Sequence, residues 1–369
     1  MTVIISALAF LLLLSFLVLI HEAGHYFAAR WSGVVVEEFG FGLPPRMTTL
    51  FRKSGTRFSL NWIPFGGFVR LQGESAVSDH DRRASGSFAH ASIPARVMIL
   101  VAGVFMNFVF AVLIFTIGFS AWGWIPTYLT VDQMKDAGQR GEIRLSPGVH
   151  IASAVAGGTA AAARLPVPST LLAVDGIPVY VPTDVVDAQA GKKSVTYTLR
   201  TITDPSKEIT VKVPVRDGKT GIEIEFSPTV TSPQRSIPRA VLLSLREAKV
   251  TTVQTVLGIS QLFQSLAWRG TVPEGITGIV GIAKLTHSSV QAGWMAYIRL
   301  MAVLSLSLAI LNILPFPSLD GGRLLFVLIE GIAQRPAPRR FELIVNTVGF
   351  LTLILLIVLV TFNDIWKLF

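Results

Sequence analysis

The sequence contains no cysteine and few charged residues. The absence of cysteine excludes disulfide bonds, thiolate metal ligands and cysteine nucleophiles. Charged residues make up 15% of the 369 residues, against 51% for hydrophobic ones, and the mean hydropathy is +0.58. This composition excludes an ordinary soluble domain and predicts a membrane protein. We therefore interpret the net charge of +9 as basic residues that set membrane topology, and we expect no nucleic-acid partner.

Four segments are apolar enough to cross a lipid bilayer, which takes about 20 residues per helix. They cover residues 3–30, 96–124, 296–314 and 341–362. The first lacks the basic n-region and the small-residue cleavage site of a signal peptide, so we expect a retained membrane helix. Residues 235–268 also have helical spacing, but 251–267 hold several Thr, Gln and Ser. We expect an amphipathic helix there, either on the bilayer or packed on a neighbouring domain.

Two regions between these segments carry strand patterns. In residues 32–95, Phe58, Leu60 and Trp62 alternate with polar residues, and the clusters GFGLPP and PFGG predict turns. Pro64, Gly66 and Gly67 would form a turn between strands at 58–62 and 68–71. The later stretches GVHIASAV, STLLAVDGIPV, KSVTYTLRT and KEITVKVPV predict a compact β-rich domain at 145–228.

The expected fold is thus a multi-pass α-helical membrane protein with four transmembrane helices, a hairpin region and an inserted β-rich domain. Its parts are residues 1–124, including the hairpin loop 32–95, then 145–228, the helical segment 235–268, and 293–369.

Basic residues are concentrated in two short loops. Residues 32–95 carry Arg46, Arg52, Lys53, Arg57, Arg70, Arg82 and Arg83, and residues 321–340 carry Arg323, Arg335, Arg339 and Arg340. The first two residues carry none, and the C-terminal tail only Lys367. The positive-inside rule predicts that both loops face the cytoplasm. Both termini and the β-rich domain are then expected outside.

The stretch HEAGH, residues 21–25, ends the first apolar run. On a helix, positions four apart share a face, so His21 and His25 can direct their rings at one ion, with Glu22 about 100° round the helix. This is the arrangement of zinc proteases, in which zinc acidifies a water and the glutamate takes its proton. The alternative is a pair of interfacial histidines that anchor a helix end. We disfavour it because ionisable groups at membrane depth are costly and usually functional.

A catalytic zinc usually has three protein ligands, and Asp320 is the candidate for the third. It follows the third apolar run in NILPFPSLDGG, residues 312–322. The alternative is an aspartate in a tight turn before Gly321 and Gly322. The first and third spans run in the same direction, so His21 and Asp320 should lie at one depth near the cytoplasmic face. A further crossing at 251–267 would separate them.

Three motifs together resemble those of site-2 proteases, the membrane-embedded zinc metallopeptidases. HEAGH (21–25), GVFMN (103–107) and NILPFPSLDGG (312–322) are similar to the family's HExxH, GxxxN and NxxPxPxLDGG. Residues 33–71 resemble the membrane-associated hairpin region of the bacterial branch, which regulates σE-type stress responses, and LLAVDGIPV (171–179) resembles its PDZ modules. GIVGIA (278–283) is similar to the GPxGI motif, with Ile279 in place of proline. The chain has room for one PDZ-like module.

The resemblance implies that His21, His25 and Asp320 bind Zn2+ and that Glu22 is the catalytic base. Asn107 and Asn312, with Gly103 in the same motif as Asn107, would hold the substrate. For Asn107 and Gly103, a helix–helix hydrogen bond and close packing are the alternative.

The implied reaction is cleavage within the transmembrane segment of a single-pass protein, such as an anti-sigma factor, in the bacterial inner membrane. An upstream site-1 protease would first trim the substrate outside. A strand edge at 58–62 or 68–71 would capture the unwound substrate by β-addition, unless the hairpin only packs on the helices. The PDZ-like domain would bind peptide or act as a steric cap. The other function classes are an inactive membrane scaffold and a metal transporter.

Overall fold

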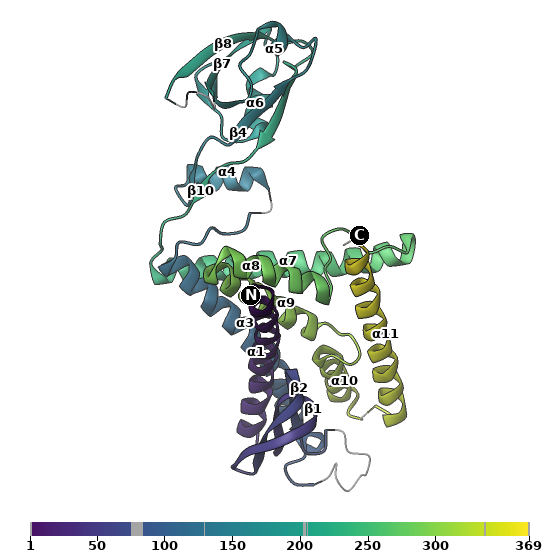
Figure 1. Ribbon diagram of the computed structural model, residues 1–369. Helices are drawn as coiled ribbons and strands as arrows, with labels where there is room; N and C mark the ends of the chain where they lie inside the picture. Colours follow the sequence, from purple (N-terminus) through teal and green to yellow (C-terminus); the bar gives the residue numbers. More distant parts are fainter. Residues whose placement is uncertain are drawn as a thin grey trace. The chain divides into compact units, whose positions relative to one another are not determined.

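The computed structural model describes residues 2–74, 84–128, 130–201, 204, 206–335 and 337–367 (Figure 1). The chain forms two compact units. The helical unit comprises Met1–Ile117 and Pro238–Phe369, and the β-rich unit comprises Gly118–Ile237. Arg82 and Arg83, two of the residues used to predict topology, lie outside the described residues.

Among the residues that the structure describes, four helices are long and apolar enough to cross a membrane, as the sequence predicts. They are α1 (Thr2–Trp31), α3 (Ile93–Ala121), α9 (Trp294–Ile313) and α11 (Arg339–Trp366). Most of their side chains are not buried within the protein, since at most 28% of the most apolar stretch of each is buried. Such apolar, outward-facing surfaces suit a lipid environment.

Three further α-helices and the short 3-10 helix η1 (Phe88–His90) lie in the described part of the helical unit. The helix α7 (Ile237–Arg269) covers the expected 235–268 segment as one unbroken helix. Its polar contacts reach α3, where Thr116 Oγ1 lies 3.0 Å from Ser244 Oγ, and α9, where Arg299 pairs with Glu247 at 3.2 Å. The sequence did not predict α8 (Ile279–Ala292) or α10 (Asp320–Ala333).

The start of α10 corrects the alternative in which Asp320 sits in a tight turn. Asp320 is the first helical residue, where the helix macrodipole favours an acidic side chain. Gly321 and Gly322 continue the helix and do not end it. A Cβ on either would clash with backbone atoms of residues 313–317, so glycine is needed here for close packing.

The strands β1 (Val36–Lys53) and β2 (Thr56–Leu71) form the sheet of the helical unit, beside the C-terminal half of α1 in Figure 1. Their connecting turn is at Ser54 and Gly55, both with positive φ. The predicted turn at Pro64, Gly66 and Gly67 falls inside the continuous strand β2, but the chain does reverse direction there. Residues 57–60 and 67–70 pair with the same segment of β1 and run in opposite directions, so a turn between the two strand segments is confirmed. The GFGLPP cluster likewise lies inside β1, at the bend where the direction of β1 reverses. Glycines at positive φ, such as Gly66 (φ +78), let one strand bend without ending.

The register of this sheet shows which strand segments are edges. Phe39 of β1 pairs with both Val69 and Phe58 of β2, so the first half of β1 lies between the two halves of β2. The second half of β1 pairs with residues 56–61 on their other side. Residues 67–71 and 46–53 are thus the edges. Residues 58–60 are interior, which removes most of one of the two predicted capture edges.

The β-rich unit contains a twisted antiparallel sheet in the order β8-β7-β5-β4-β9, with β6 on β5. These strands are β4 (Val149–Ala154), β5 (Ser169–Val174), β6 (Ile177–Pro178), β7 (Ser194–Thr201), β8 (Glu208–Pro214) and β9 (Ile222–Phe226). The short strands β3 (Arg144–Leu145) and β10 (Val230–Thr231) pair with each other, and α4 (Val131–Gln139), α5 (Thr159–Ala162) and α6 (Pro182–Gln189) complete the unit. Its core is apolar and includes the fully buried Ile151, Leu171 and Leu199.

Candidate metal centre

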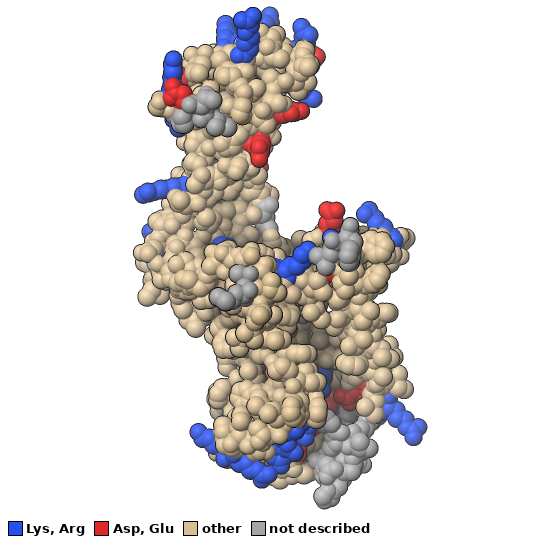
Figure 2. All heavy atoms as spheres, in the orientation of Figure 1, with Lys and Arg blue, Asp and Glu red and all other residues tan. Residues whose placement is uncertain are grey.

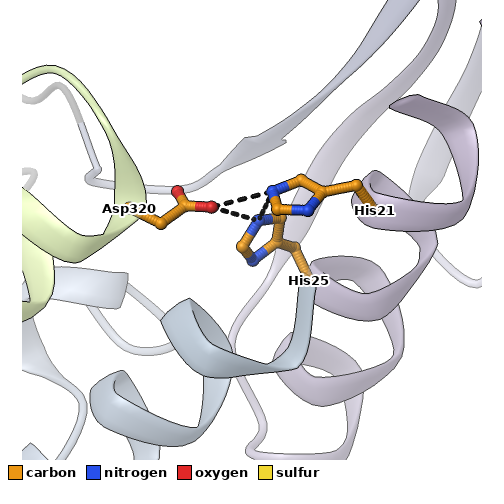
Figure 3. Close-up of side chains that lie close together, drawn as sticks. All are labelled: His21, His25 and Asp320. Atoms are coloured by element: carbon orange, nitrogen blue, oxygen red, sulfur yellow. Dashed lines mark hydrogen bonds and ion pairs between the residues drawn. The ribbon is translucent and has the colours of Figure 1, made fainter. Parts of the chain in front are cut away.

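The two histidines of HEAGH lie one turn apart on α1, and both are buried. His21 is 5% exposed and His25 is 8% exposed, with ring centroids 4.7 Å apart. Asp320, the first residue of α10, approaches them from the other side (Figure 3). The structure thus brings together three side chains that are separated by almost 300 positions in the sequence.

Three ligand atoms converge between these side chains. Asp320 Oδ2 lies 2.8 Å from His21 Nε2 and 3.2 Å from His25 Nε2, and the two Nε2 atoms are 3.1 Å apart. In a tetrahedral zinc site with Zn–N distances of about 2.0–2.1 Å, neighbouring ligand atoms are roughly 3.3 Å apart. The spacing therefore matches the edges of a coordination shell around one small ion.

The hydrogen bond on the far side of His25 determines what its Nε2 presents. His25 Nδ1 lies 2.8 Å from the carbonyl oxygen of Ile99, which can only accept, so Nδ1 carries the hydrogen. A neutral ring then directs a lone pair from Nε2 at His21 Nε2 and the Asp320 carboxylate. A histidine oriented through its outer nitrogen is common among metal ligands. Convergent acceptors of this kind fit a cation, and two imidazoles with one carboxylate fit zinc.

Close contact between α1 and α3 depends on two glycines. A Cβ on Gly103 would lie 2.5 Å from His25 Nε2 and 2.9 Å from His21 Cε1, and a Cβ on Gly24 would clash with the carbonyl of Ala102. Gly103 therefore contacts the histidine rings themselves. This favours the packing interpretation of Gly103 over a place at the substrate.

Asn107 lies one turn beyond Gly103 on α3 and is fully buried. Within the described part of the chain, neither its Oδ1 nor its Nδ2 has a hydrogen-bond partner. Its backbone carbonyl accepts a hydrogen bond from Ser305 Oγ at 3.0 Å, so the helix contact is made by the main chain and leaves the amide unused. Asn312 is half-buried in the last turn of α9. Substrate binding by either asparagine stays a prediction.

Glu22 connects the centre to the sheet. Its Oε2 accepts a hydrogen bond from the backbone N–H of Val69 at 2.9 Å. Val69 belongs to the edge segment 67–71, so the free side of that edge faces Glu22. The sequence pointed to this strand but gave no sign of the contact, because residues 22 and 69 are linked only through the fold.

Two ion pairs that the sequence did not predict hold α10 in place. The guanidinium of Arg96 on α3 forms a bidentate ion pair with the carboxylate of Glu330, with N–O distances of 2.7 and 3.0 Å. Arg323 forms an ion pair with Glu74, which follows β2. Charged residues beside apolar spans were visible in the sequence, but their partners lie up to 249 positions away. Both pairs fix the helix that carries Asp320.

Comparison with known proteins identifies the family. The profile of "Peptidase family M50" matches residues 9–356. A protein of Clostridium perfringens (strain 13 / Type A), named as a "putative zinc metalloprotease", is 29% identical over 99% of this chain and 98% of its own. Proteins with the same description from Fusobacterium nucleatum (27%, covering 97% of both chains) and Agrobacterium fabrum (29%, covering 96% of this chain and 94% of its own) are also similar. The chain therefore belongs to peptidase family M50, a family of zinc enzymes.

Proposed function

We propose that this membrane protein is an intramembrane zinc endopeptidase that cleaves single-pass membrane proteins within their transmembrane segments. One observation carries the proposal. The ligand atoms of His21, His25 and Asp320 converge at about 3 Å spacing, and both histidines lie on α1, a helix long enough to span a membrane, with Glu22 next in sequence to His21. Buried ionisable groups on such a helix are rare without a function.

The residues of the centre have distinct roles. His21, His25 and Asp320 would hold the zinc ion, which supplies Lewis acidity and lowers the pKa of a water molecule. Glu22 takes the proton of the attacking water and passes it to the leaving amine. The Val69 N–H holds Glu22 Oε2 at 2.9 Å, which orients the carboxylate and leaves its other oxygen for the water.

The substrate must be unwound before its backbone can reach Glu22, because a helix shields its peptide bonds. The edge segment 67–71 can receive an extended peptide by strand addition. Its free side faces Glu22, so an added strand would place a peptide bond beside the carboxylate. The unpaired amide of Asn107 supplies a donor and an acceptor for that backbone. Asn312, before Asp320, would contribute similarly.

The orientation that we propose in the membrane rests on the distribution of basic residues between the loops. The positive-inside rule favours an active site near the cytoplasmic face of a bacterial inner membrane, with both termini and the β-rich unit outside. A β-rich unit of PDZ type outside would admit only trimmed substrates, anti-sigma-like proteins already cut by a site-1 protease. This unit could bind the end of a trimmed substrate or only exclude bulky substrates. Saturable binding of peptides to the β-rich unit, measured by competition, would favour peptide recognition.

Cleavage of a tagged single-pass substrate tests the proposal, with wild type compared with Glu22→Gln and zinc content measured in both. We expect cleavage by the wild type alone and equal zinc in both samples. Glu37→Gln is the matched control, because Glu37 is exposed on β1 and should leave cleavage unchanged. Equal cleavage by wild type and Glu22→Gln would exclude Glu22 as the base.

Two other outcomes point to other functions. Zinc in the wild type with no cleavage across a panel of trimmed substrates would favour an inactive scaffold. Zinc movement into vesicles would favour a transporter, and a wild type without zinc would contradict the proposed centre.

A further inference from the structure

The sheet of the helical unit has two chemically different faces. On one face, aromatic rings extend from α1 across the sheet: Tyr26 lies 5.7 Å from Phe39, Phe39 stacks on Phe58 at 5.7 Å, and Phe58 stacks on Phe51 at 4.5 Å. Residues next to these along each strand point to the opposite face. That face carries Glu38, Arg57 and Arg70, which are register partners across the strands.

Three arginines surround one buried carboxylate on this face. Glu38 is 5% exposed, and its carboxylate lies 3.5 Å from Arg46, 3.5 Å from Arg70 and 3.9 Å from Arg57. A single carboxylate balances one guanidinium, so the group keeps an excess of positive charge. We call these four residues the arginine cluster.

Two buried side-chain atoms on this face can donate hydrogen bonds that the described residues do not accept. Arg57 Nε and Ser59 Oγ are buried and have no hydrogen-bond partner within the described residues. Ser59 lies two positions after Arg57 on β2, so both point to the same face. An oxyanion would balance the excess charge of the cluster, and phosphate oxygens pair well with guanidinium groups.

The surroundings of the cluster are those of a membrane interface. The sheet begins at Val36, five residues after the end of the membrane-length helix α1. Exposed apolar side chains accompany the basic ones on its strands: Met47 (52%), Leu50 (49%), Trp62 (64%) and Phe65 (44%). Figure 2 shows Lys and Arg side chains gathered where β1 and β2 lie in Figure 1. Basic and aromatic side chains together are typical of the headgroup region.

We propose that the arginine cluster binds the phosphate-bearing headgroup of an anionic phospholipid. The basic charge complements an anionic leaflet, to which Lys and Arg near the surface are attracted. The exposed apolar side chains favour a lipid over a soluble phosphate, because they would contact acyl chains. Arg70 follows Val69, whose N–H holds Glu22, so the bound lipid would also steady the strand at the candidate metal centre. The binding itself does not depend on the proposed protease activity.

The test measures lipid retention by the full-length protein in detergent, by native mass spectrometry with phosphatidylglycerol and phosphatidylcholine. We expect the wild type to retain phosphatidylglycerol preferentially. Arg46→Gln and Arg70→Gln, at side chains that are 42% and 55% exposed, should each weaken that retention about fivefold. Arg70→Lys should keep most of it. Arg200→Gln on the β-rich unit, at a side chain that is 44% exposed, is the matched control and should change nothing.

The result that would overturn the proposal is equal retention in all four variants, or no preference for phosphatidylglycerol in the wild type. Inorganic phosphate and a soluble acidic peptide are added as competitors. Displacement of the lipid by millimolar phosphate alone would show a site for soluble anions, and tighter binding of the peptide would show a site for a protein segment. Either outcome rejects a lipid site. Unchanged thermal unfolding of each variant shows that lost retention does not come from misfolding.

Discussion

Two buried polar side chains, one in each unit, differ in whether they have a hydrogen-bond partner. In the β-rich unit, the hydroxyl of the fully buried Tyr197 accepts a hydrogen bond from Gln189 at 2.7 Å and lies 2.8 Å from Thr220 Oγ1. In the helical unit, the equally buried amide of Asn107 has no partner within the described residues, and neither has His21 Nδ1. A satisfied buried network specifies a packed core, whereas an unsatisfied one calls for a partner from outside the chain. The comparison predicts that a substitution at Asn107 changes function and that one at Tyr197 changes stability.

The largest effect is expected from Asp320→Ala. Removing the carboxylate takes one of the three ligands from the candidate metal centre, so zinc should be lost from the purified protein and cleavage should fall by at least about a thousandfold. Metal analysis and the cleavage assay measure the two effects. Helix content by circular dichroism is the control, because α10 should persist. Full zinc content in this variant would mean that Asp320 is not a ligand.

A slightly smaller effect is expected from Gly103→Ala. The added Cβ would lie 2.5 Å from His25 Nε2, so the histidine rings must move, and zinc affinity should fall about 10- to 100-fold, as when the support of a ligand is lost. Gly258→Ala on α7 is the matched control, since its Cβ meets nothing within 4 Å. It should leave zinc affinity unchanged or slightly increase stability through helix propensity. Equal affinities in both variants would exclude the packing role of Gly103.

Much of the helical unit could be predicted because its signals are local. Long apolar runs predicted all four membrane-length helices, and the spacing of four residues predicted that His21 and His25 share a face of α1. Asp320 could be paired with them because it ends the third apolar run, as His21 ends the first. Each inference needed only neighbouring residues and the length of a span.

The remaining features depend on distant contacts. The turn expected at Pro64, Gly66 and Gly67 is present as a reversal of the chain, but the sequence does not show that the backbone stays paired through it as one bent strand, because that pairing depends on Leu43 and Ile63 meeting across the sheet. The start of α10 at Asp320 was missed because two glycines argue against a helix, and only their contact with residues 313–317 explains them. The hydrogen bond from Val69 N–H to Glu22 likewise joins two segments that are far apart in the sequence, and no local pattern predicts that they meet.

An intermediate effect is expected from Asn107→Leu. Leucine has a similar shape and removes both unsatisfied polar atoms, so the free energy of unfolding should stay the same or rise. Cleavage should nevertheless fall about 10- to 100-fold with zinc retained, because the amide no longer meets the substrate. If Asn107 instead formed a helix–helix hydrogen bond, the free energy of unfolding would fall by about 1 kcal/mol. Cleavage would then fall only because less of the protein is folded. Thermal unfolding and cleavage, measured on the same sample, separate the two.

The smallest effect on cleavage is expected from Tyr197→Phe in the β-rich unit. Burial raises the pKa of Tyr197, so the side chain stays a neutral phenol whose hydroxyl can both accept and donate. Its removal leaves Gln189 and Thr220 without that partner inside the core, which should lower the free energy of unfolding by about 1–3 kcal/mol. Zinc content and cleavage of a trimmed substrate should not change, because the contacts of Tyr197 lie within its own unit. A loss of cleavage without a loss of stability would show that the buried network around Tyr197 also serves function, and the contrast with Asn107 would fail.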